Sequence, residues 1–362
     1  MHRLIESTEC GLYCEKGDFH IDAWKNVDRN LITHAHSDHA RRVAKRYLCS
    51  RESEAILRER LGSDCNIASI NYRDTIDING VSVSFHPAGH VRGSAQIRVE
   101  HKGEIFVVSG DYKRQRDRTC TEFEVVKCHS LITESTFGLP IYRWREPEVV
   151  MADINGWWRR NASEGLTSVI FAYALGKAQR ILSGLDPSIG PILLHGAMVK
   201  LTDLYRAGGV DLPDTMHASP ENSKLHKAKA IVIAPSSADG SPWIRKFAPY
   251  SSAAASGWMQ IRGFRRRGAI DRGFVLSDHV DWPDLLRTIE ETGADHIGIT
   301  HGYTTTVCRY LRERGKDAYT VATHFEVDDE SLSLATDPSA DKGIFGADAA
   351  PLSPPSAAGE TT

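Results

Sequence analysis

The chain has 362 residues, of which 41% are hydrophobic and 25% are charged, and its formal net charge is −3. This composition is typical of a soluble globular protein with two ordinary domains or one large domain that carries an insertion. No run approaches the roughly 18 to 20 apolar residues of a membrane span, and the first residues contain no apolar run suited to a signal peptide. The seven cysteines include no C-x-x-C pair. We therefore expect a cytoplasmic protein with reduced thiols and no membrane association.

The charge is unevenly distributed. Residues 327–362 contain seven acidic residues and one basic residue, so the chain before them carries a net charge of +3. This acidic tail has few apolar residues, and we expect it to be disordered. A mildly basic body permits a polyanionic substrate, but the charge alone does not decide whether that substrate is a nucleic acid.

Short β-structure is predicted over residues 11–23, and a buried strand is predicted to end at Ile32. The sequence T-H-A-H-S-D-H follows directly, at residues 33–39. Ser37 and Asp38 are residue types that cap helices, so we predict a helix over residues 40–47. The histidines would then lie where a strand gives way to a helix, and such loops often carry function.

Four side chains of this stretch can bind metal, namely His34, His36, Asp38 and His39. His34 and His36 are two positions apart, so on an extended segment both rings leave the same side and can bind one ion. Asp38 and His39 follow a turn and face a second point nearby. Imidazole and carboxylate together suit zinc, manganese or iron. Two histidines alone would more often be surface or core residues, but four ligands in six positions are hard to explain in that way.

Further polar side chains follow predicted strands. His90 comes after V-S-V-S-F-H, whose alternation predicts a half-buried strand, and it lies between glycines that permit a sharp bend. Asp111 follows a strand predicted over residues 104–109, and its carboxylate could bridge two ions. Glu134 ends another predicted strand. Lys113 opens a basic loop that is either solvated or a phosphate-contacting rim beside the metals.

Residues 147–267 have a different pattern, in which helices and strands alternate. This alternation predicts a separate parallel α/β unit. The predicted helices are 148–161, 176–185 and 197–207, and the predicted strands are 167–173, 191–195 and 230–234. Such sheets bind ligands where strands end, so Lys177 and Ser236 are candidate substrate contacts, and Arg262 is a third candidate next to a short basic turn. The ligand pattern then resumes with His279 and His301, each after a predicted strand, so the α/β unit is predicted to be an insertion.

This ordered set of motifs resembles the metallo-β-lactamase fold, and the insertion resembles its β-CASP branch, which processes nucleic acids. The resemblance covers roughly residues 10 to 325. It implies an α/β protein, an αββα sandwich with an inserted parallel α/β domain. The implied domains are 1–146 and 268–326 for the two parts of the sandwich, 147–267 for the β-CASP insertion and 327–362 for the tail. Y-A-L-G-K-A-Q, A-P-S-S-A-D-G-S-P-W and S-G-W-M-Q are similar to stretches of bacterial DNA-ligase-associated exonucleases. Artemis-type nucleases and messenger-RNA 3′-end processing endonucleases are more distantly similar.

The resemblance also implies a role for each site residue. One divalent ion, zinc or manganese, is expected on His34, His36, His90 and Asp111. A second ion is expected on Asp38, His39, Asp111 and His301, so that Asp111 bridges the two. Asp22 would orient the metal loop, and Asp38 would also hold the attacking hydroxide. His279 is the expected general acid, with Glu134 keeping it oriented and charged.

The sequence therefore predicts a metal-dependent DNA exonuclease that hydrolyses phosphodiester bonds with a hydroxide activated by two metal ions. We expect nucleic acid as its partner, with DNA preferred over RNA, and a role in DNA repair with an ATP-dependent DNA ligase. One alternative is an RNA-processing endonuclease or exonuclease of the 3′-end processing type. Another is a small-molecule ester hydrolase, which the insertion disfavours. The third is a metal-stabilised nucleic-acid-binding scaffold without catalysis.

Overall fold

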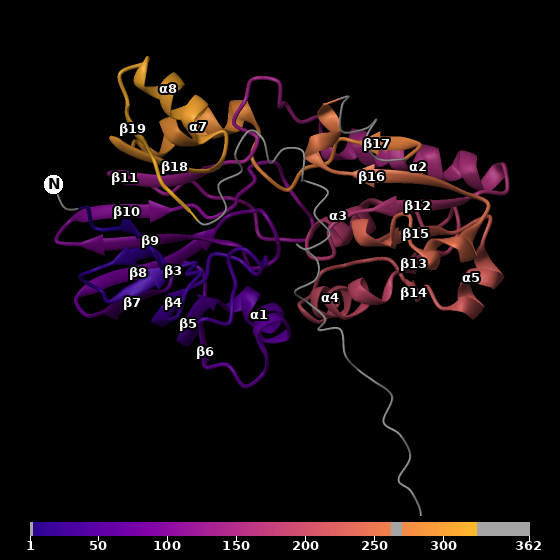
Figure 1. The fold of residues 1–362 in the computed structure, drawn as a ribbon, viewed down its shortest axis with the longest axis horizontal. Coiled ribbons are helices and arrows are strands. Elements are labelled where there is room, and N and C mark those ends of the chain that lie inside the picture. Colours follow the sequence, from indigo (N-terminus) through magenta and orange to yellow (C-terminus); the bar gives the residue numbers. More distant parts are fainter. Residues whose placement is uncertain (1–2, 262–269, 324–362) are drawn as a thin grey trace, which may run out of the picture.

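The computed structural model describes residues 3–261 and 270–323, and the strands of these residues form three β-sheets (Figure 1). The first sheet has six strands in sequence order, which are antiparallel from β1 to β3 and parallel from β3 to β6. These strands are β1 (Glu6–Thr8), β2 (Gly11–Cys14), β3 (Phe19–Ile21), β4 (Val27–Leu31), β5 (Ala44–Ser50) and β6 (Ile67–Ile70). The 3-10 turn η1 (Arg51–Ser53) and helix α1 (Glu54–Leu61) connect β5 to β6.

The second sheet has seven strands and combines two distant parts of the chain. Its order is β19 (Asp317–Thr320), β18 (His296–Gly302), β11 (Ser130–Ser135), β10 (Glu104–Val108), β9 (Ala95–His101), β8 (Val81–Pro87) and β7 (Thr75–Ile78). Strand β18 pairs in parallel with β11, although more than 160 residues separate their starts. The last described strands therefore complete a sheet that the first third of the chain begins.

Side chains alternate between the two faces of each strand, and this alternation explains how the two sheets pack. Val81, Val83 and Phe85 are two residues apart along β8, and all three lie in one buried cluster with Phe19 and Leu31 of the first sheet. Val107 of β10 points the other way, into a cluster with residues of α7 (Trp282–Thr292) and α8 (Thr304–Arg312). Figure 1 shows these two helices along the side of the second sheet. The two sheets thus bury a core between them, and α7 and α8 cover the outer face of the second sheet.

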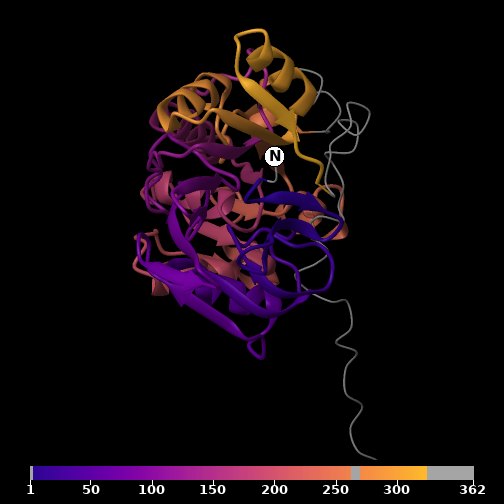
Figure 2. The ribbon, with the colours of Figure 1, turned by 90° about the vertical axis from the view of Figure 1, so that its left-hand side faces the viewer.

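The third sheet is parallel throughout, with the order β14 (Met216–His217), β13 (Ile192–Leu194), β15 (Ile231–Ala234), β12 (Thr167–Phe171), β16 (Tyr250–Ala255) and β17 (Arg272–Phe274). Its helices are α2 (Pro147–Ser163), α3 (Lys177–Gly184), α4 (Gly196–Ala207) and α5 (Pro220–His226), and its 3-10 turns are η2 (Ser236–Ala238), η3 (Pro242–Phe247) and η4 (Gly257–Gln260). Figure 1 shows α3 and α4 on the side that faces the other two sheets. In Figure 2 those two sheets face the viewer and the third lies behind them.

One buried cluster joins the third sheet to the first. It contains Ile56 and Leu57 of α1, Trp158 of α2 and Ile181 of α3. Because these side chains bury each other, the third sheet is packed against the rest of the described chain and not merely tethered to it.

The predicted fold class, α/β with a parallel α/β insertion between the two parts of the sandwich, is confirmed. The predicted helix over residues 40–47 is wrong, because β5 begins at Ala44. Strand β5 lies between β4 and β6 and pairs Leu48 with Leu31, so the hydrogen-bonded ladder outweighs the capping pattern of Ser37 and Asp38. The strands β14 and β16 were not predicted from the sequence, whereas β17 overlaps the strand predicted before His279.

The predicted domain boundaries stay a prediction. The boundary at residue 267 and the predicted acidic tail lie outside the described residues. Within residues 3–261 and 270–323, none of the helices combines the length and apolar character needed to cross a bilayer.

Candidate metal centre

Strand ends and loops of the first two sheets bring the predicted metal-binding residues together. His34, His36 and His39 follow β4, and His90 lies in the loop between β8 and β9. Asp111 follows β10, Glu134 lies near the end of β11, and His301 lies near the end of β18. Because β10, β11 and β18 run in parallel, their carboxyl ends meet at one edge of the second sheet.

A first group of possible metal ligands consists of His34, His36, His90 and Asp111, whose ligand atoms all lie within 4.8 Å of one another. Nδ1 of His36 lies 3.1 Å from Nε2 of His34 and 3.0 Å from Nε2 of His90. Oδ2 of Asp111 lies 3.5 Å from Nε2 of His34. Nitrogen atoms at about 2.0–2.1 Å from one tetrahedral ion are separated by similar distances, so this group has the dimensions of a zinc-type site.

A second group consists of His39, Asp111 and His301, again within 4.8 Å. Nε2 of His39 lies 3.6 Å from Oδ2 of Asp111 and 3.6 Å from Oδ2 of Asp38. This nitrogen is buried and has no hydrogen bond. A buried polar atom without a partner costs about 1–3 kcal/mol, and a divalent cation between these carboxylates would satisfy it. The residues present therefore fit a second ion, with Asp111 common to both groups.

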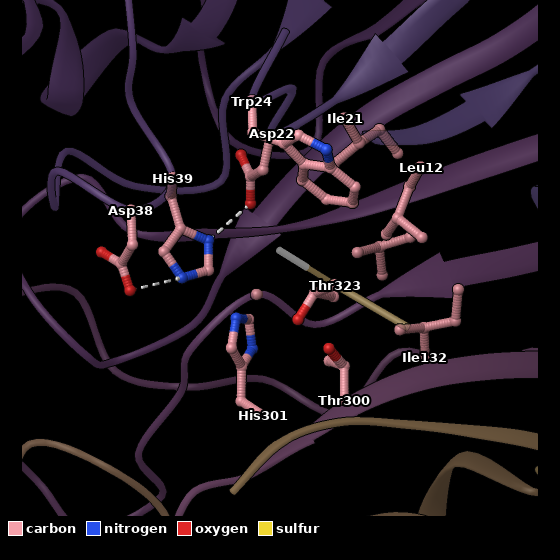
Figure 3. A pocket seen from close by; sticks show the side chains of 12 residues that line it. Leu12, Ile21, Asp22, Trp24, Asp38, His39, Ile132, Thr300, His301 and Thr323 are labelled. Carbon is pink, nitrogen blue, oxygen red and sulfur yellow. Dashed lines mark hydrogen bonds and ion pairs between the residues drawn. The ribbon is translucent and has the colours of Figure 1, made fainter. Parts of the chain in front are cut away.

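Asp22 holds the histidine loop in place. Its Oδ1 accepts a hydrogen bond from the backbone N–H of Thr33 at 2.8 Å, and its Oδ2 accepts one from the Thr33 hydroxyl at 2.6 Å. The same Oδ2 lies 2.8 Å from Nδ1 of His39, as Figure 3 shows. A carboxylate on the far nitrogen of a ligand histidine fixes the ring so that its other nitrogen faces the metal. This geometry matches the orienting contact predicted for Asp22.

Two tight backbone turns position His90 and Asp111. Gly89 has φ +72°, and a Cβ atom there would lie 2.3 Å from the carbonyl oxygen of Lys113. Gly110 has φ +56°, and a Cβ atom there would lie 2.6 Å from Cβ of Thr33. Both positions need glycine, because they combine a left-handed conformation with a close neighbour. The glycines noted beside His90 and Asp111 in the sequence thus let these ligands approach the histidine loop.

His279 and Glu134 form a buried pair beside the first group. Nδ1 of His279 lies 2.9 Å from Oε2 and 3.1 Å from Oε1 of Glu134, and Oε1 also accepts the backbone N–H of Tyr112 at 2.8 Å. Glu134 is fully buried, whereas the His279 side chain is 23% exposed. Nδ1 of His279 is 3.9 Å from Oδ2 of Asp111. Because Nδ1 of His279 contacts Glu134, its other ring nitrogen can contact a different partner.

The charges of the centre divide its histidines into two kinds. Burial lowers the pKa of His36 and that of His301 to about 4, and it lowers the pKa of His34 and His90 further below the ordinary value. Burial has the same tendency at His39 and His279, but neighbouring carboxylates outweigh it. Asp38 and Asp111 raise the pKa of His39 to about 10, and Glu134 and Asp111 raise that of His279 to about 9. The centre thus combines four histidines with a lowered pKa, whose neutral form binds metal, with two histidines, His39 and His279, whose pKa is raised by neighbouring carboxylates.

Comparisons with known proteins agree with this arrangement, although no family model matches the chain. The chain is 32% identical over 314 residues to a protein named probable DNA ligase from Opitutus terrae, which covers 86% of this chain and 30% of that protein. It is 34% identical over 134 residues to endoribonuclease YSH1 of Saccharomyces cerevisiae, covering 33% of this chain and 15% of that protein. It is 35% identical over 122 residues to cleavage and polyadenylation specificity factor 73 of Drosophila melanogaster, covering 33% and 18%. The chain thus spans less than a third of the length of each of these relatives.

The fold also matches a solved structure, a protein of unknown function from Enterococcus faecalis V583. The TM-score is 0.56 at 14% sequence identity, over 77% of this chain and 76% of that one, so this likeness concerns the fold alone. The chain has the metallo-β-lactamase fold of the β-CASP branch. Five of the six strands of the third sheet lie within the predicted β-CASP insertion, so we call this sheet and its helices the β-CASP part.

The β-CASP part and the segment that follows it both contribute directly to the metal centre. Nε2 of His36 lies 3.2 Å from the carbonyl oxygen of Leu175, which follows β12. Nδ1 of His90 lies 2.9 Å from the carbonyl oxygen of Asp278. In each ring the carbonyl oxygen faces one nitrogen, and the other nitrogen faces the neighbouring ligands of the first group. The two carbonyls therefore set the orientation of both rings.

A buried network of charges holds Asp278 in its place. Its carboxylate accepts the amine of Lys177 at 2.8 Å and Nη1 of Arg180 at 2.9 Å, and Arg180 also binds Asp117 through Nε at 2.5 Å. All four side chains are at most 9% exposed. Asp117 lies between β10 and β11 of the second sheet, whereas Lys177 and Arg180 belong to α3. The network therefore links the β-CASP part to the loop that carries Asp111.

The four residues predicted to contact the substrate lie in different environments. The amine of Lys113 donates to the carbonyl oxygen of Ser277 at 2.6 Å and is buried, and Lys177 is buried with its amine on Asp278. Both amines are engaged inside the protein, so their predicted contact with a substrate finds no support in this structure. Ser236 is exposed at the end of β15. Arg262 lies outside the described residues. The roles of Ser236 and Arg262 stay predictions.

Sequence reasoning missed the side chains that support the ligands. Thr33, Asp117, Asp278 and Arg180 were not singled out as site residues. The signals were weak, because Asp278 appeared only as the middle letter of S-D-H and Arg180 only as the residue after Y-A-L-G-K-A-Q. His86 was not predicted as a ligand, and it lies outside the possible metal groups among the described residues, next to Glu124.

Proposed function

We propose that this chain is a two-metal nuclease that hydrolyses phosphodiester bonds in nucleic acid, and that it acts on DNA as an exonuclease. The observation that carries the proposal is the meeting of two possible ligand groups at Asp111, with the His279–Glu134 pair beside them. His34, His36, His90 and Asp111 would hold one divalent ion. Asp38, His39, Asp111 and His301 would hold the other, and zinc and manganese both suit this ligand set.

Two bound ions would lower the pKa of water between them and neutralise a non-bridging phosphate oxygen. Asp38 is suited to align the attacking water, because its side chain is 40% exposed while Oδ2 stays 3.6 Å from Nε2 of His39. In the hydrolysis the water oxygen forms a bond to phosphorus, and the bond from phosphorus to the ester oxygen breaks. The leaving ester oxygen then needs a proton.

His279 is the group proposed to give that proton, from Nε2. Its Nδ1 is held by Glu134, which fixes the ring and stabilises the protonated form. The His279 side chain is also 23% exposed, whereas the side chains of His34 and His90 are fully buried. The position of Glu134 therefore favours proton transfer over metal binding for His279.

DNA is the proposed substrate because the relative that matches over 86% of this chain is named as a DNA ligase. The nuclease domain would then act together with an ATP-dependent DNA ligase in DNA repair. The two cited relatives named as endoribonucleases match over 46% and 33% of the chain. An RNA-processing nuclease is the second candidate, because these relatives are named as endoribonucleases.

The experiment that tests the proposal offers matched single-stranded DNA and RNA oligonucleotides to the purified protein with added manganese or zinc. Each oligonucleotide is labelled at one end, in two versions. Stepwise shortening of DNA with RNA spared is the expected result, and the label position gives the direction of attack. Internal cuts in RNA would replace the proposal by the RNA-processing alternative.

The control is the double variant Asp38→Ala, His39→Ala, which removes two side chains of the second group while leaving the first group intact. It should be inactive on both substrates. If the wild-type protein binds two ions per chain and cleaves neither substrate, the proposal is wrong and the scaffold alternative takes its place.

A further inference from the structure

A small apolar pocket lies directly behind His39 and His301 (Figure 3). Its volume is about 40 Å³, and Leu12, Ile21 and Trp24 form much of its wall. Two hydroxyl groups, those of Thr300 and Thr323, also line it. A buried water needs about 10–15 Å³ and two to four polar partners, so the pocket is large enough for water.

Three polar atoms around this pocket lack a hydrogen bond. They are Oγ1 of Thr300, Oγ1 of Thr323 and Nδ1 of His301, and each is buried. Figure 3 shows one ring nitrogen of His301 on the side of His39 and the other on the side of the two threonines, whose hydroxyls are turned toward the ring. Each such atom costs about 1–3 kcal/mol if it stays unsatisfied, so three of them at one small pocket indicate a shared polar partner.

His301 needs such a partner more than the other histidines do. His36 and His90 each face a backbone carbonyl, and His39 faces Asp22, so the far nitrogen of each of these rings is held by the protein. Nδ1 of His301 has no such contact. The backbone of His301 is in a left-handed conformation, with φ +55°. A ligand histidine usually donates its far N–H to a carboxylate, a carbonyl or a water.

We propose that Thr300 and Thr323 together hold a water molecule against Nδ1 of His301 and so fix this ring for metal binding. The water would accept a hydrogen bond from Nδ1–H, so the ring proton stays on Nδ1 and the other ring nitrogen, turned toward His39 and Asp111, carries the lone pair. It would donate its own two protons to the threonine hydroxyl oxygens. Thr300 and Thr323 are then positioning residues for the second ion, and this inference rests on the metal pair of the proposed function.

The test replaces each threonine by valine, which has a similar shape but no hydroxyl group. Zinc affinity is measured on the full chain by competition with a chromophoric chelator, and the histidine tautomers are read from long-range ¹H–¹⁵N spectra. Thr300→Val should lower the affinity for one of the two bound ions by about 10- to 100-fold, which is the usual effect of losing an orienting contact. The affinity for the other ion should stay unchanged. In the zinc-loaded protein it should also change the His301 ring signals. Thr323→Val should act in the same direction.

Two further variants separate this role from a general effect on folding. Thr300→Ser keeps the hydroxyl and should restore the affinity. Thr292→Val also removes a buried hydroxyl, one that donates to the carbonyl oxygen of Ile289 at 3.0 Å in α7, and it should leave both ions unaffected. If Thr300→Val and Thr323→Val both bind the two ions with wild-type affinity, this inference is wrong but the proposed function is not affected. Fewer than two ions per chain in the wild-type protein would overturn the proposed function with it.

Discussion

At the scale of single residues, the centre depends on which partner each histidine has. The far nitrogens of His36 and His90 face carbonyl oxygens, and that of His39 faces Asp22. Nδ1 of His279 faces the carboxylate of Glu134, which itself receives the N–H of Tyr112. Carboxylates raise the pKa of His39 and His279, whereas burial lowers the pKa of the rings that face carbonyl oxygens.

Replacing His279 by alanine tests this division. His279 is not part of the two groups proposed to hold metal, so His279→Ala should bind two ions with nearly wild-type affinity. Turnover should fall by about 10²–10⁴-fold, the usual contribution of a general acid. Metal content is measured by elemental analysis and turnover with a labelled DNA oligonucleotide.

The matched control is His86→Ala, which removes a histidine of β8 that bonds Ser84 at 3.0 Å and lies outside the metal groups. This variant should keep both metals and turnover. Loss of an ion from His279→Ala would show that His279 is a ligand, and full turnover would remove the general-acid assignment.

At the scale of secondary-structure elements, glycine turns bring the strand ends close enough to share ions. Gly110→Ala places a methyl group 2.6 Å from Cβ of Thr33, which Asp22 already holds at its backbone and its hydroxyl. The neighbouring Asp111 must then move away from the histidine loop. We expect this variant to fold but to lose at least tenfold in zinc affinity, as measured by chelator competition.

Gly80→Ala is the matched control for this prediction. Gly80 has φ +81°, so alanine there meets a similar backbone strain of about 1–2 kcal/mol, but its Cβ atom would have no neighbour within 4 Å. This variant should lose stability without losing zinc affinity. Equal zinc affinity in both alanine variants would mean that the contact of Gly110 with Thr33 does not position Asp111.

The same scale shows what the sequence could and could not predict. His90, Asp111 and Glu134 could be singled out because each follows an apolar or alternating run, and such runs predict strands from neighbouring residues alone. The first residues of β5 were predicted as a helix because the pairing of β5 with β4 and β6 is a tertiary effect. The contacts from Leu175 to His36 and from Asp278 to His90 join residues 139 and 188 positions apart, so local sequence contains no signal for them.

At the scale of the whole molecule, the β-CASP part and the metallo-β-lactamase part are joined by buried charges as well as by apolar packing. Arg180 of α3 is the centre of these charges, because it binds both Asp117 and Asp278 while it is only 4% exposed. Asp278 also presents its carbonyl oxygen to His90. Stability and metal binding should therefore be coupled through Arg180.

Arg180→Leu should reveal this coupling. The variant leaves the buried Asp117 without its cationic partner and Asp278 with Lys177 alone, and removing one member of a buried ion pair costs about 3–5 kcal/mol. We expect a lower free energy of unfolding by that amount, measured by urea denaturation with tryptophan fluorescence. We also expect weaker binding of the ion assigned to His90, because Asp278 is no longer fixed.

The control is Arg287→Leu, which removes a cation that is 61% exposed and bonds Glu291 at 2.7 Å one helical turn away. An exposed pair of this kind contributes at most about 1 kcal/mol, so both stability and metal affinity should stay close to wild type. A similar small change in Arg180→Leu would contradict the coupling, since Asp117 would then have found water or another partner. Lower stability with unchanged metal affinity would limit the role of Arg180 to holding the two parts of the molecule together.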